Sequence, residues 1–549
     1  MRSRTRALVL ATAVAAGASV QAQVTFERLL RADAEPWNWL TYSGTYRSQR
    51  YSPLTQITPQ NVKNLEPQWV FQSRSLEKFE ATPLVVDGVM YTVQAPNDVI
   101  ALDAATGRIF WTYSYTPSPQ ARPCCGRINR GLAILGDTLF MGTIDAHLVA
   151  IDAKNGQPLW DTTVARAESG YALAHAPLVV KDKVIVGTAG GEYGIRGFIA
   201  AYNARTGKEV WRFYTIPGPG EPGHETWGGD SWQHGGGSIW VTGSYDPELN
   251  LTYWGVGNPG PDWNGDPRPG DNLYTDSVVA LDADTGKLKW YYQFSPHDEF
   301  DYDSVQVPVL ADMEWQGKDG RRTPRKLMFF ANRNGIFYAL DRATGEFLMG
   351  KPFVTVNWMD GFDSKGKPIR IAGKVPTTEG TLIYPGNQGG TNWYNPSYSP
   401  RTGLFYIPTW ANYSSIYIKA PEEFKEGQRY GGGFPKSPIP FGRTTQNFRK
   451  EDEGYGAVRA IDPRTGERKW EFKMTDVTDA GILTTASDLL FSGGREGYFY
   501  ALDARTGAVL WKANLGGAVA SGPMTYLAGG RQYVAVAAGN ALFSFALRQ

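Results

Sequence analysis

The eleven-residue stretch ALDAATGRIFW, from Ala101 to Trp111, carries the pattern A-x-D-x-x-T-G-x-x-x-W that organises this chain. The apolar residues before the aspartate predict a β-strand. The aspartate can cap the turn, and the glycine supplies the positive φ that closes a hairpin. The tryptophan then lies on the returning strand, where its large ring can pack one unit against the next. The pattern therefore predicts a hairpin that must stack on its neighbours.

The pattern recurs along most of the chain, and its turn glycines are 41 to 79 residues apart. Periods of this length, with several short strands each, are typical of propeller blades, whereas an open solenoid would leave exposed strand edges. Eight copies, one for each blade, predict an all-β protein: an eight-bladed β-propeller with tryptophan-docking repeats. The further copies occupy residues 150–160, 201–211, 280–290, 339–349, 460–470 and 501–511, with a degenerate copy at 397–407 and departures at Asn155, Asn203 and Met349.

The two ends of the mature chain are expected to meet. Residues 42–71 are predicted to pair with the C-terminal strand at residues 532–546, which would close the ring. Two long insertions, residues 217–263 and 411–453, exceed the length of hairpin turns. They are expected to be surface loops over one face of the propeller.

Residues 1–22 are predicted to be a secretion signal peptide. Arg2, Arg4 and Arg6 precede an apolar run that is too short to be a lasting membrane span, and small residues lie before Gln23. Residues 23–549 are then one propeller domain, located in the periplasm. No other stretch approaches about 18 uninterrupted apolar residues, so no membrane span is expected in the mature chain.

The charge balance and the cysteines exclude several classes of function. The chain has 55 basic and 54 acidic residues, which gives no footprint for nucleic acid or an anionic membrane. Its two cysteines, Cys124 and Cys125, are adjacent, and no C-x-x-C-H motif for covalent haem is present.

An acidic segment, residues 296–303, is the strongest candidate for chemistry. It contains Asp298, Glu299, Asp301 and Asp303. Buried carboxylates repel one another and lose hydration unless a cation or a proton neutralises them. The alternative is a solvated acidic loop. If the segment is extended, Asp301 and Asp303 point to the same face.

The repeat, the Pro123-Cys124-Cys125-Gly126 motif and the acidic segment together resemble the pyrroloquinoline-quinone (PQQ)-dependent alcohol dehydrogenases of the methanol/ethanol dehydrogenase group. The resemblance covers nearly the whole mature chain. It implies oxidation of a small primary alcohol to an aldehyde, by hydride transfer to C5 of PQQ. It also implies that electrons pass to an external periplasmic cytochrome c.

The resemblance also assigns residues to the cofactor. A disulfide between Cys124 and Cys125 is expected to lie against one face of PQQ, with Trp227 on the other face. Stacking of this kind is dominated by dispersion. The remaining cofactor-binding residues that the resemblance implies are Glu80, Arg130, Thr143, Gly190, Gly191, Arg333, Asn392 and Trp393.

The metal site follows from the same resemblance. Glu192, Asn258 and Asp301 match the family's oxygen ligands, which suit a hard cation such as calcium. Asp303 occupies a position that is uncharged in calcium-type members and acidic in lanthanide-type members, so a lanthanide is favoured and calcium is the alternative. Asp301 is the expected general base and Arg333 the cation beside the quinone oxygens. Asp298 and Glu299 are expected to be ordinary polar positions.

The sequence also departs from the family. Asp479 stands where a tryptophan is common, and the chain continues only briefly after Gly539, without the usual Gly- and Trp-rich segment. The substrate pocket is therefore expected to be more open, and an alcohol other than methanol is plausible. The rival hypothesis is a non-catalytic propeller that acts as an envelope scaffold. The oligomeric state stays open.

Overall fold

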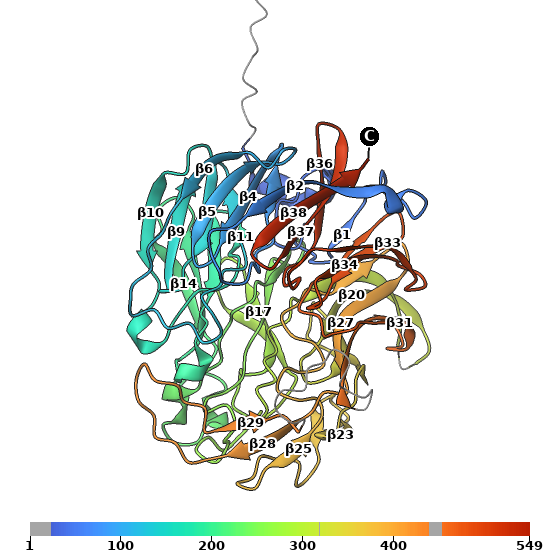
Figure 1. Cartoon of the computed structure of the whole chain (residues 1–549). Coiled ribbons are helices and arrows are strands. Elements are labelled where there is room, and N and C mark those ends of the chain that lie inside the picture. The colour runs from blue at the N-terminus through green and yellow to red at the C-terminus, as the bar shows by residue number, and fades with distance from the viewer. Residues whose placement is uncertain (1–22, 318, 439–452, 549) are drawn as a thin grey trace, which may run out of the picture.

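The computed structural model describes residues 23–317, 319–438 and 453–548, in which strands dominate (Figure 1). The predicted signal peptide and part of the second insertion, residues 439–452, lie outside the described residues. Within the described ranges, no helix is both long enough and apolar enough to cross a membrane. The helices there are short: α1 (Phe26–Leu30) and the 3-10 helices η1 (Ala32–Ala34), η2 (Val62–Asn64), η3 (Ala167–Ser169), η4 (Gly191–Tyr193), η5 (His224–Thr226) and η6 (Ser231–His234).

Eight of the sheets in the described residues contain four antiparallel strands, and one of these adds β1 in parallel at its edge. The four strands are consecutive in the chain in six of these sheets. Four sheets cover the first part of the chain: β3 (Leu84–Val86) to β6 (Ile109–Tyr113), with β4 (Val89–Gln94) and β5 (Asp98–Asp103); β7 (Ala133–Leu135), β8 (Thr138–Gly142), β9 (His147–Asp152) and β10 (Pro158–Thr163); β11 (Leu178–Val180), β12 (Lys183–Gly187), β13 (Phe198–Asn203) and β14 (Glu209–Tyr214); and β15 (Ser244–Asp246), β16 (Leu251–Gly255), β17 (Ser277–Asp282) and β18 (Leu288–Gln293).

The other four sheets use the rest of the chain. They are β19 (Val309–Gln316), β20 (Arg322–Ala331), β21 (Ile336–Asp341) and β22 (Phe347–Pro352); β26 (Ser397–Ser399), β27 (Leu404–Ala411), β30 (Tyr455–Ile461) and β31 (Arg468–Lys473); β32 (Leu483–Thr485), β33 (Leu489–Gly493), β34 (Tyr498–Asp503) and β35 (Val509–Asn514), with β1 (Tyr51–Ser52) beside β32; and β2 (Leu65–Gln72), β38 (Ala541–Leu547), β37 (Arg531–Ala538) and β36 (Met524–Ala528).

Each regular repeat forms the hairpin that its sequence predicts. In the first copy, Asp103 Oδ1 accepts hydrogen bonds from the N–H groups of Ala105 and Thr106, and Gly107 has a φ of +73°. Ala101 lies directly opposite Trp111 on the paired strand, with a bulge beside it. The small alanine leaves room for the indole. The same alanine-to-indole register recurs in the copies that end at Trp160, Trp211, Trp290, Trp470 and Trp511.

Five of the six repeat tryptophans contact the turn glycine of the following sheet, and the sixth, Trp511, packs against Phe545. A Cβ built on Gly156 would lie 2.6 Å from the ring of Trp111, so that position has no room for a side chain. The indole N–H of Trp111 donates to the carbonyl of Ala153 in the same turn, at 3.2 Å. Equivalent contacts join Trp69 to Gly107, Trp160 to Gly207, Trp211 to Gly286, Trp290 to Gly345 and Trp470 to Gly507.

The prediction that the degenerate copy forms a separate sheet is wrong. Residues 397–407 form the β26–β27 hairpin, which belongs to the same sheet as the regular copy on β30 and β31. No atom lies within 4 Å of a Cβ built on Gly403, so no tryptophan packs there. The eighth sheet contains no copy of the repeat. Its outer strand is β2, and Trp69 of β2 takes the place of the repeat tryptophan.

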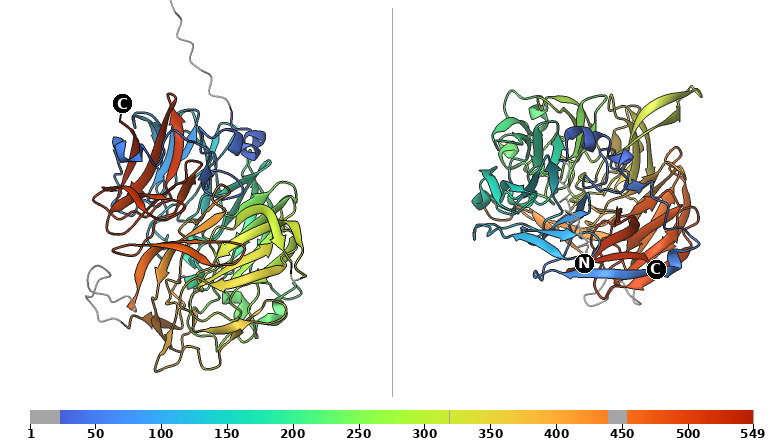
Figure 2. Two further views of the ribbon diagram at one scale, coloured as in Figure 1. Left: turned by 90° about the vertical axis from the view of Figure 1, so that its right-hand side faces the viewer. Right: turned by 90° about the horizontal axis from the view of Figure 1, so that it is seen from above.

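The pairing of the two chain ends is confirmed. Strand β2 pairs antiparallel with β38, from Leu65 opposite Leu547 to Gln72 opposite Ala541. The blue strand β2 and the red strand β38 lie side by side in Figure 1, and the view from above in Figure 2 shows the same meeting of blue and red segments.

The two insertions are more structured than the predicted surface loops. The second half of the first insertion contains β15 and β16, and residues 235–246 are buried except for Trp240, so the prediction is wrong there. The second insertion contributes strands to a small sheet at the bottom of Figure 1, formed by β25 (Thr381–Ile383), β28 (Ser415–Lys419) and β29 (Gly433–Lys436). A two-stranded sheet joins β23 (Met359–Phe362) to β24 (Pro368–Arg370).

Candidate active site

The acidic segment is buried and is folded by its own first carboxylate. Asp298 Oδ2 accepts hydrogen bonds from the N–H groups of Phe300, at 3.2 Å, and Tyr302, at 3.0 Å. Burial raises the pKa of Asp298 to about 6. Asp301 has a φ of +60°, so the backbone is not extended there and that premise of the sequence analysis is wrong. The turn, and not an alternating strand, sets the direction of the Asp301 side chain.

Glu299 also has a structural partner. Its Oε2 pairs with Arg370 at 2.7 Å, and its Oε1 accepts a hydrogen bond from the N–H of Gly265. Arg370 in turn donates to the carbonyl of His297. Asp298 and Glu299 are therefore not ordinary polar positions: they anchor the segment that presents Asp301 and Asp303.

Arg333 joins the two later carboxylates of this segment. It lies in the turn between β20 and β21 and is only 4% exposed. Its Nη2 donates to Asp301 Oδ2 at 2.9 Å, and its Nη1 donates to Asp303 Oδ2 at 2.7 Å. Its Nε donates to the carbonyl of Asn387 at 2.8 Å. Asp301 and Asp303 thus converge on one guanidinium, which also fixes their orientation.

A second loop brings an amide and a further carboxylate to the same place. The backbone N–H of Asn258 donates to Asp303 Oδ1 at 3.0 Å, and Asn258 Nδ2 donates to Asp262 Oδ1 at 2.9 Å. A Cβ built on Gly191 would lie 3.8 Å from Asn258 Oδ1, which places this loop against the turn that carries Glu192. Glu192, Asn258, Asp301 and Asp303 therefore lie in one neighbourhood.

The charges of this neighbourhood are strongly coupled. Burial raises the pKa of Asp301 well above its usual value; Arg333 lowers it, and the charges of Asp303, Asp262 and Glu192 raise it again. Burial and the charge of Asp303 also raise the pKa of Glu192. One buried guanidinium does not offset four carboxylates, of which Asp262 and Asp303 are buried and Glu192 and Asp301 half-buried. The donor set therefore fits a hard, highly charged cation bound by oxygen atoms.

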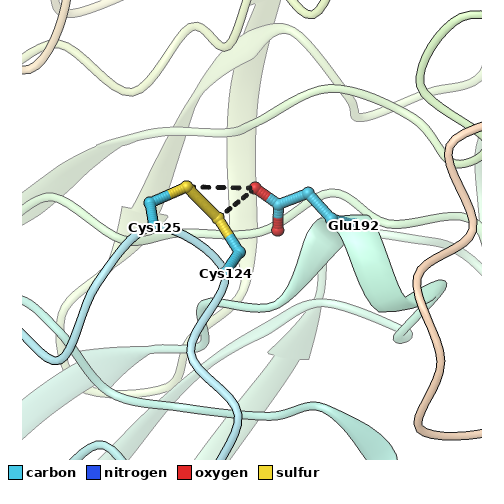
Figure 3. A group of neighbouring side chains, drawn as sticks. All are labelled: Cys124, Cys125 and Glu192. Carbon is cyan, nitrogen blue, oxygen red and sulfur yellow. Dashed lines mark hydrogen bonds between the residues drawn. A yellow bond between two sulfur atoms is a disulfide. The ribbon is translucent and has the colours of Figure 1, made fainter. Parts of the chain in front are cut away.

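The two cysteines form a disulfide that lies against Glu192, as Figure 3 shows. Cys124 Sγ is 2.8 Å from Glu192 Oε1, and Cys125 Sγ is 4.0 Å from the same oxygen. A disulfide sulfur carries no proton and is not a thiolate, so these contacts are neither hydrogen bonds nor a metal cluster that includes sulfur. They place the disulfide beside Glu192, at the edge of the cluster of acidic side chains.

A second group of side chains is formed by Arg130, Glu80 and two indoles. Arg130 Nη2 is 3.0 Å from Glu80 Oε2. The guanidinium lies 4.9 Å from the ring centre of Trp240 and 4.6 Å from that of Trp393. Arg130 Nε is buried, and no described residue accepts a hydrogen bond from it. A buried donor without a partner between aromatic rings fits a planar anionic cofactor.

Other predicted residues are placed as follows. The Thr143 hydroxyl is fully buried and donates to Asp145 within its own turn, at 2.5 Å. The Asn392 side-chain oxygen accepts from the N–H of Trp393 at 2.9 Å. The Trp227 indole is buried and donates to the carbonyl of Leu273 at 2.6 Å. The interactions described here do not bring Thr143 or Trp227 together with Arg130 or Asp303.

Sequence reasoning missed Trp240 and Asp262. Trp240 stacks on Arg130, and its side chain also hydrogen-bonds Asp303, whose pKa is raised by burial, an effect that this hydrogen bond partly opposes. Trp240 therefore joins the two halves of the site. A signal was available in the sequence, because Trp240 lies three residues after the glycine run 235–237 and outside the repeat. Asp262 lies four residues after Asn258, a spacing that indicates contact only when the loop conformation is known.

Comparison with protein families gives two matches. A profile described as "Glucose/ethanol/alcohol dehydrogenase, beta-propeller domain" matches residues 39–356. A profile described as "Outer membrane protein assembly factor BamB" matches residues 454–548. The first match covers most of the residues of the site; the second covers only repeats near the C-terminus.

Individual relatives match almost the whole chain. The quinohemoprotein alcohol dehydrogenase ADH-IIG of Pseudomonas putida is 40% identical, over 97% of this chain and 76% of that protein. The lanthanide-dependent methanol dehydrogenase of Methylacidiphilum fumariolicum is 37% identical, over 93% of this chain and 86% of that protein. A solved structure of a europium-containing methanol dehydrogenase is 34% identical, with a TM-score of 0.86 over 95% of this chain and 100% of that chain. These likenesses show an all-β propeller.

Proposed function

The chain belongs to the family of PQQ-dependent alcohol dehydrogenases, and on this premise we propose that it oxidises a primary alcohol to an aldehyde in the periplasm. The observation that carries the proposal is the convergence of Asp301 and Asp303 on Arg333, beside Asn258 and Glu192. A general base, a cation beside it and an oxygen-ligand metal site are the parts that this reaction needs.

The residues around Arg130 would hold PQQ. The Cys124–Cys125 disulfide would form one wall and Trp240 an aromatic wall, in place of Trp227, because Trp240 contacts Arg130. When bound, PQQ supplies the redox chemistry, since its C5 carbonyl accepts a hydride. The other residues proposed for the cofactor are Glu80, Arg130, Thr143, Gly190, Gly191, Arg333, Asn392 and Trp393.

Glu192, Asn258, Asp301 and Asp303 would hold one metal ion, which supplies Lewis-acid character when bound. We propose a lanthanide over calcium, because these three carboxylates and that of Asp262 stand against one buried guanidinium there. The relative from Methylacidiphilum fumariolicum is named as lanthanide-dependent, which supports the choice.

Asp301 would accept the hydroxyl proton of the alcohol. Its Oδ2 is held by Arg333, and the turn formed by Asp298 fixes its backbone. Arg333 would then stay in place as charge develops, because Asn387 and Asp303 fix its guanidinium. Asp301 would take this proton, because the chemistry that PQQ would supply uses only the hydride.

The proposal is tested by loading the purified protein with PQQ and either Ca²⁺ or La³⁺. We expect reduction of an artificial dye that depends on primary alcohols, with more activity under La³⁺. The absence of dye reduction under both metals, in protein that has bound PQQ, would contradict the proposal.

The proposal also covers the architecture of the chain and the path of its electrons. We propose that each of the eight four-stranded sheets is one blade and that the repeat tryptophans dock neighbouring blades. Residues 1–22 would be the secretion signal, and residues 23–549 the single catalytic domain. We propose that an external cytochrome c takes the electrons, as the resemblance to the family implies.

The scaffold hypothesis is not favoured. The BamB-type profile matches only residues 454–548, which contain two copies of the repeat and neither Asp301 nor Arg333. A scaffold has no use for buried carboxylates that converge on one guanidinium, and burying them lowers stability unless a ligand compensates.

A further inference from the structure

Asp262 is a buried carboxylate that the proposed metal ligands leave without a function. It lies in the loop that follows β16 and is 1% exposed. Its Oδ1 accepts a hydrogen bond from Asn258 Nδ2 at 2.9 Å. Buried carboxylates are rare without a specific partner, and the partner here is the amide of a residue that faces the metal site.

The hydrogen bond fixes which way the amide of Asn258 points. Asn258 Nδ2 donates to Asp262 and also to the carbonyl of Pro259, at 3.2 Å, so both of its protons are used. Because the amide group is planar, Oδ1 faces away from these acceptors. A Cβ on Gly191 would be 3.8 Å from this oxygen, which places Oδ1 on the side of Glu192.

The loop from Asn258 to Asp262 is held against the turn that carries Glu192. A Cβ on Gly260 would lie 3.7 Å from the carbonyl oxygen of Gly191. The N–H of Gly237 donates to the carbonyl of Asn258, and the N–H of Gly260 donates to the carbonyl of Gly235. The backbone of Asp262 is therefore fixed. A fixed backbone is needed if a residue is to orient a metal ligand without binding the metal itself.

Asp262 also changes the charge of the site. With Glu192, Asp301 and Asp303 it makes four carboxylates, and Arg333 is the buried cation that contacts two of them. Four negative charges and one positive charge give a formal net charge of −3 when all are ionised, against −2 without Asp262. Arg429, which also acts on Glu192 and Asp262, is exposed and is therefore screened by water.

We propose that Asp262 is a positioning residue of the metal site, which turns Asn258 Oδ1 toward the cation and adds the charge that favours a trivalent over a divalent ion. The proposal rests on the proposed metal site. Ion affinity in oxygen-ligand sites depends on the number of ligand charges and on site rigidity, and Asp262 affects both.

Two substitutions separate orientation from charge. Asp262→Asn keeps a side-chain oxygen that accepts from Asn258 Nδ2 but removes the charge. Asp262→Ala removes both. Asp266→Asn is the matched control, because Asp266 is an exposed aspartate of the same loop that pairs with Lys419 on the surface. Thermal unfolding of each variant verifies that the fold is kept.

The measurement is the dissociation constant of La³⁺ and of Ca²⁺ for the PQQ-loaded protein, obtained by competition with a chelator of known affinity. We expect Asp262→Asn to weaken La³⁺ binding about tenfold and Ca²⁺ binding by less, so that the preference for La³⁺ falls. Asp262→Ala should weaken both ions about tenfold or more. Asp266→Asn should match the parent protein.

Three results would overturn the inference in different ways. If Asp262→Asn keeps the parent ratio of La³⁺ to Ca²⁺ affinity, Asp262 does not favour the trivalent ion through its charge. If Asp262→Ala binds both ions as the parent does, Asp262 does not orient Asn258 for the metal. If the parent protein itself binds neither ion while it binds PQQ, the proposed metal site fails, and the inference fails with it.

Discussion

Arg333, whose guanidinium is buried, donates a hydrogen bond from Nη2 to Oδ2 of the half-buried Asp301 at 2.9 Å. The same guanidinium holds Asp303, so two carboxylates that are two residues apart in the sequence meet at one cation. Arg333 lies 32 residues from Asp301 along the chain, and the turn between β20 and β21 presents it. On this relationship rests the proposal that the acidic segment is part of the active site.

Replacement of Asp301 by Asn should abolish turnover. The amide keeps the shape of the side chain but cannot accept the alcohol proton, and a positioned base contributes about 10²- to 10⁴-fold to rate. PQQ binding should persist, since the walls around Arg130 are untouched. The check is alcohol-dependent dye reduction together with the absorbance of bound cofactor. Activity near the parent level would show that another group is the base.

Substitution of Trp240 and substitution of Trp227 should have different effects on PQQ binding. Trp240→Ala should weaken PQQ binding about tenfold, because it removes the indole that stacks on Arg130. Trp227→Ala should mainly lower the free energy of unfolding, by about 3 kcal/mol, because its buried indole donates to Leu273. Equilibrium titration with PQQ and denaturant unfolding separate the two effects. A variant at Trp227 that folds stably but loses PQQ would reverse the assignment.

Docking of the repeats is tested by a pair of glycines. Gly156 and Gly403 have similar φ values, +75° and +69°, so an alanine at either position meets the same backbone strain of about 1–2 kcal/mol. Only at Gly156 would the new Cβ also meet a ring, that of Trp111, at 2.6 Å. Gly156→Ala should therefore lower stability by about 1–3 kcal/mol more than Gly403→Ala. Equal losses in denaturant unfolding would speak against docking at this turn.

The buried ring of His175 should make the folded protein less stable at mildly acidic pH. Its Nδ1–H donates to the carbonyl of Ala176 at 2.8 Å, and its Nε2 accepts from the N–H of Gly187 at 2.9 Å, so the neutral ring is the form that fits. Burial lowers its pKa from 6.5 to about 4, and the charge of Arg130 also lowers it.

The sign of the effect follows from proton binding. Between about pH 6.5 and 4, the unfolded chain binds a proton that the folded protein does not, so the free energy of unfolding falls as pH falls. One pH unit corresponds to about 1.4 kcal/mol, which gives a loss of about 2 kcal/mol from pH 7 to 5. His175→Gln should show a smaller loss over this interval in urea unfolding. The same loss in both proteins would contradict the role of His175.

The fold was predictable where the sequence repeats a local rule. Asp103 caps its turn, Gly107 closes it, and Ala101 faces Trp111, and each of these depends on residues that are neighbours in sequence. The prediction failed for the degenerate copy at residues 397–407. A Thr-Gly turn is common to many hairpins and does not indicate which strands of a sheet it joins.

The site was predictable only in part, because its contacts are not local. Asp301 and Arg333 could be taken from the resemblance, but the left-handed turn at Asp301 depends on the buried carboxylate of Asp298. Trp227 and Trp240 are both tryptophans of one insertion, and only the packing around Arg130 distinguishes them.

The most direct test of the account is the amount of aldehyde formed per protein-bound PQQ when no electron acceptor is present. Protein loaded with PQQ and La³⁺ should form about one aldehyde for each bound PQQ, because two electrons fill one cofactor. Protein without metal, or with Asp301→Asn, should form almost none. A metal-loaded protein that binds PQQ yet forms no aldehyde from any primary alcohol would contradict the central claim.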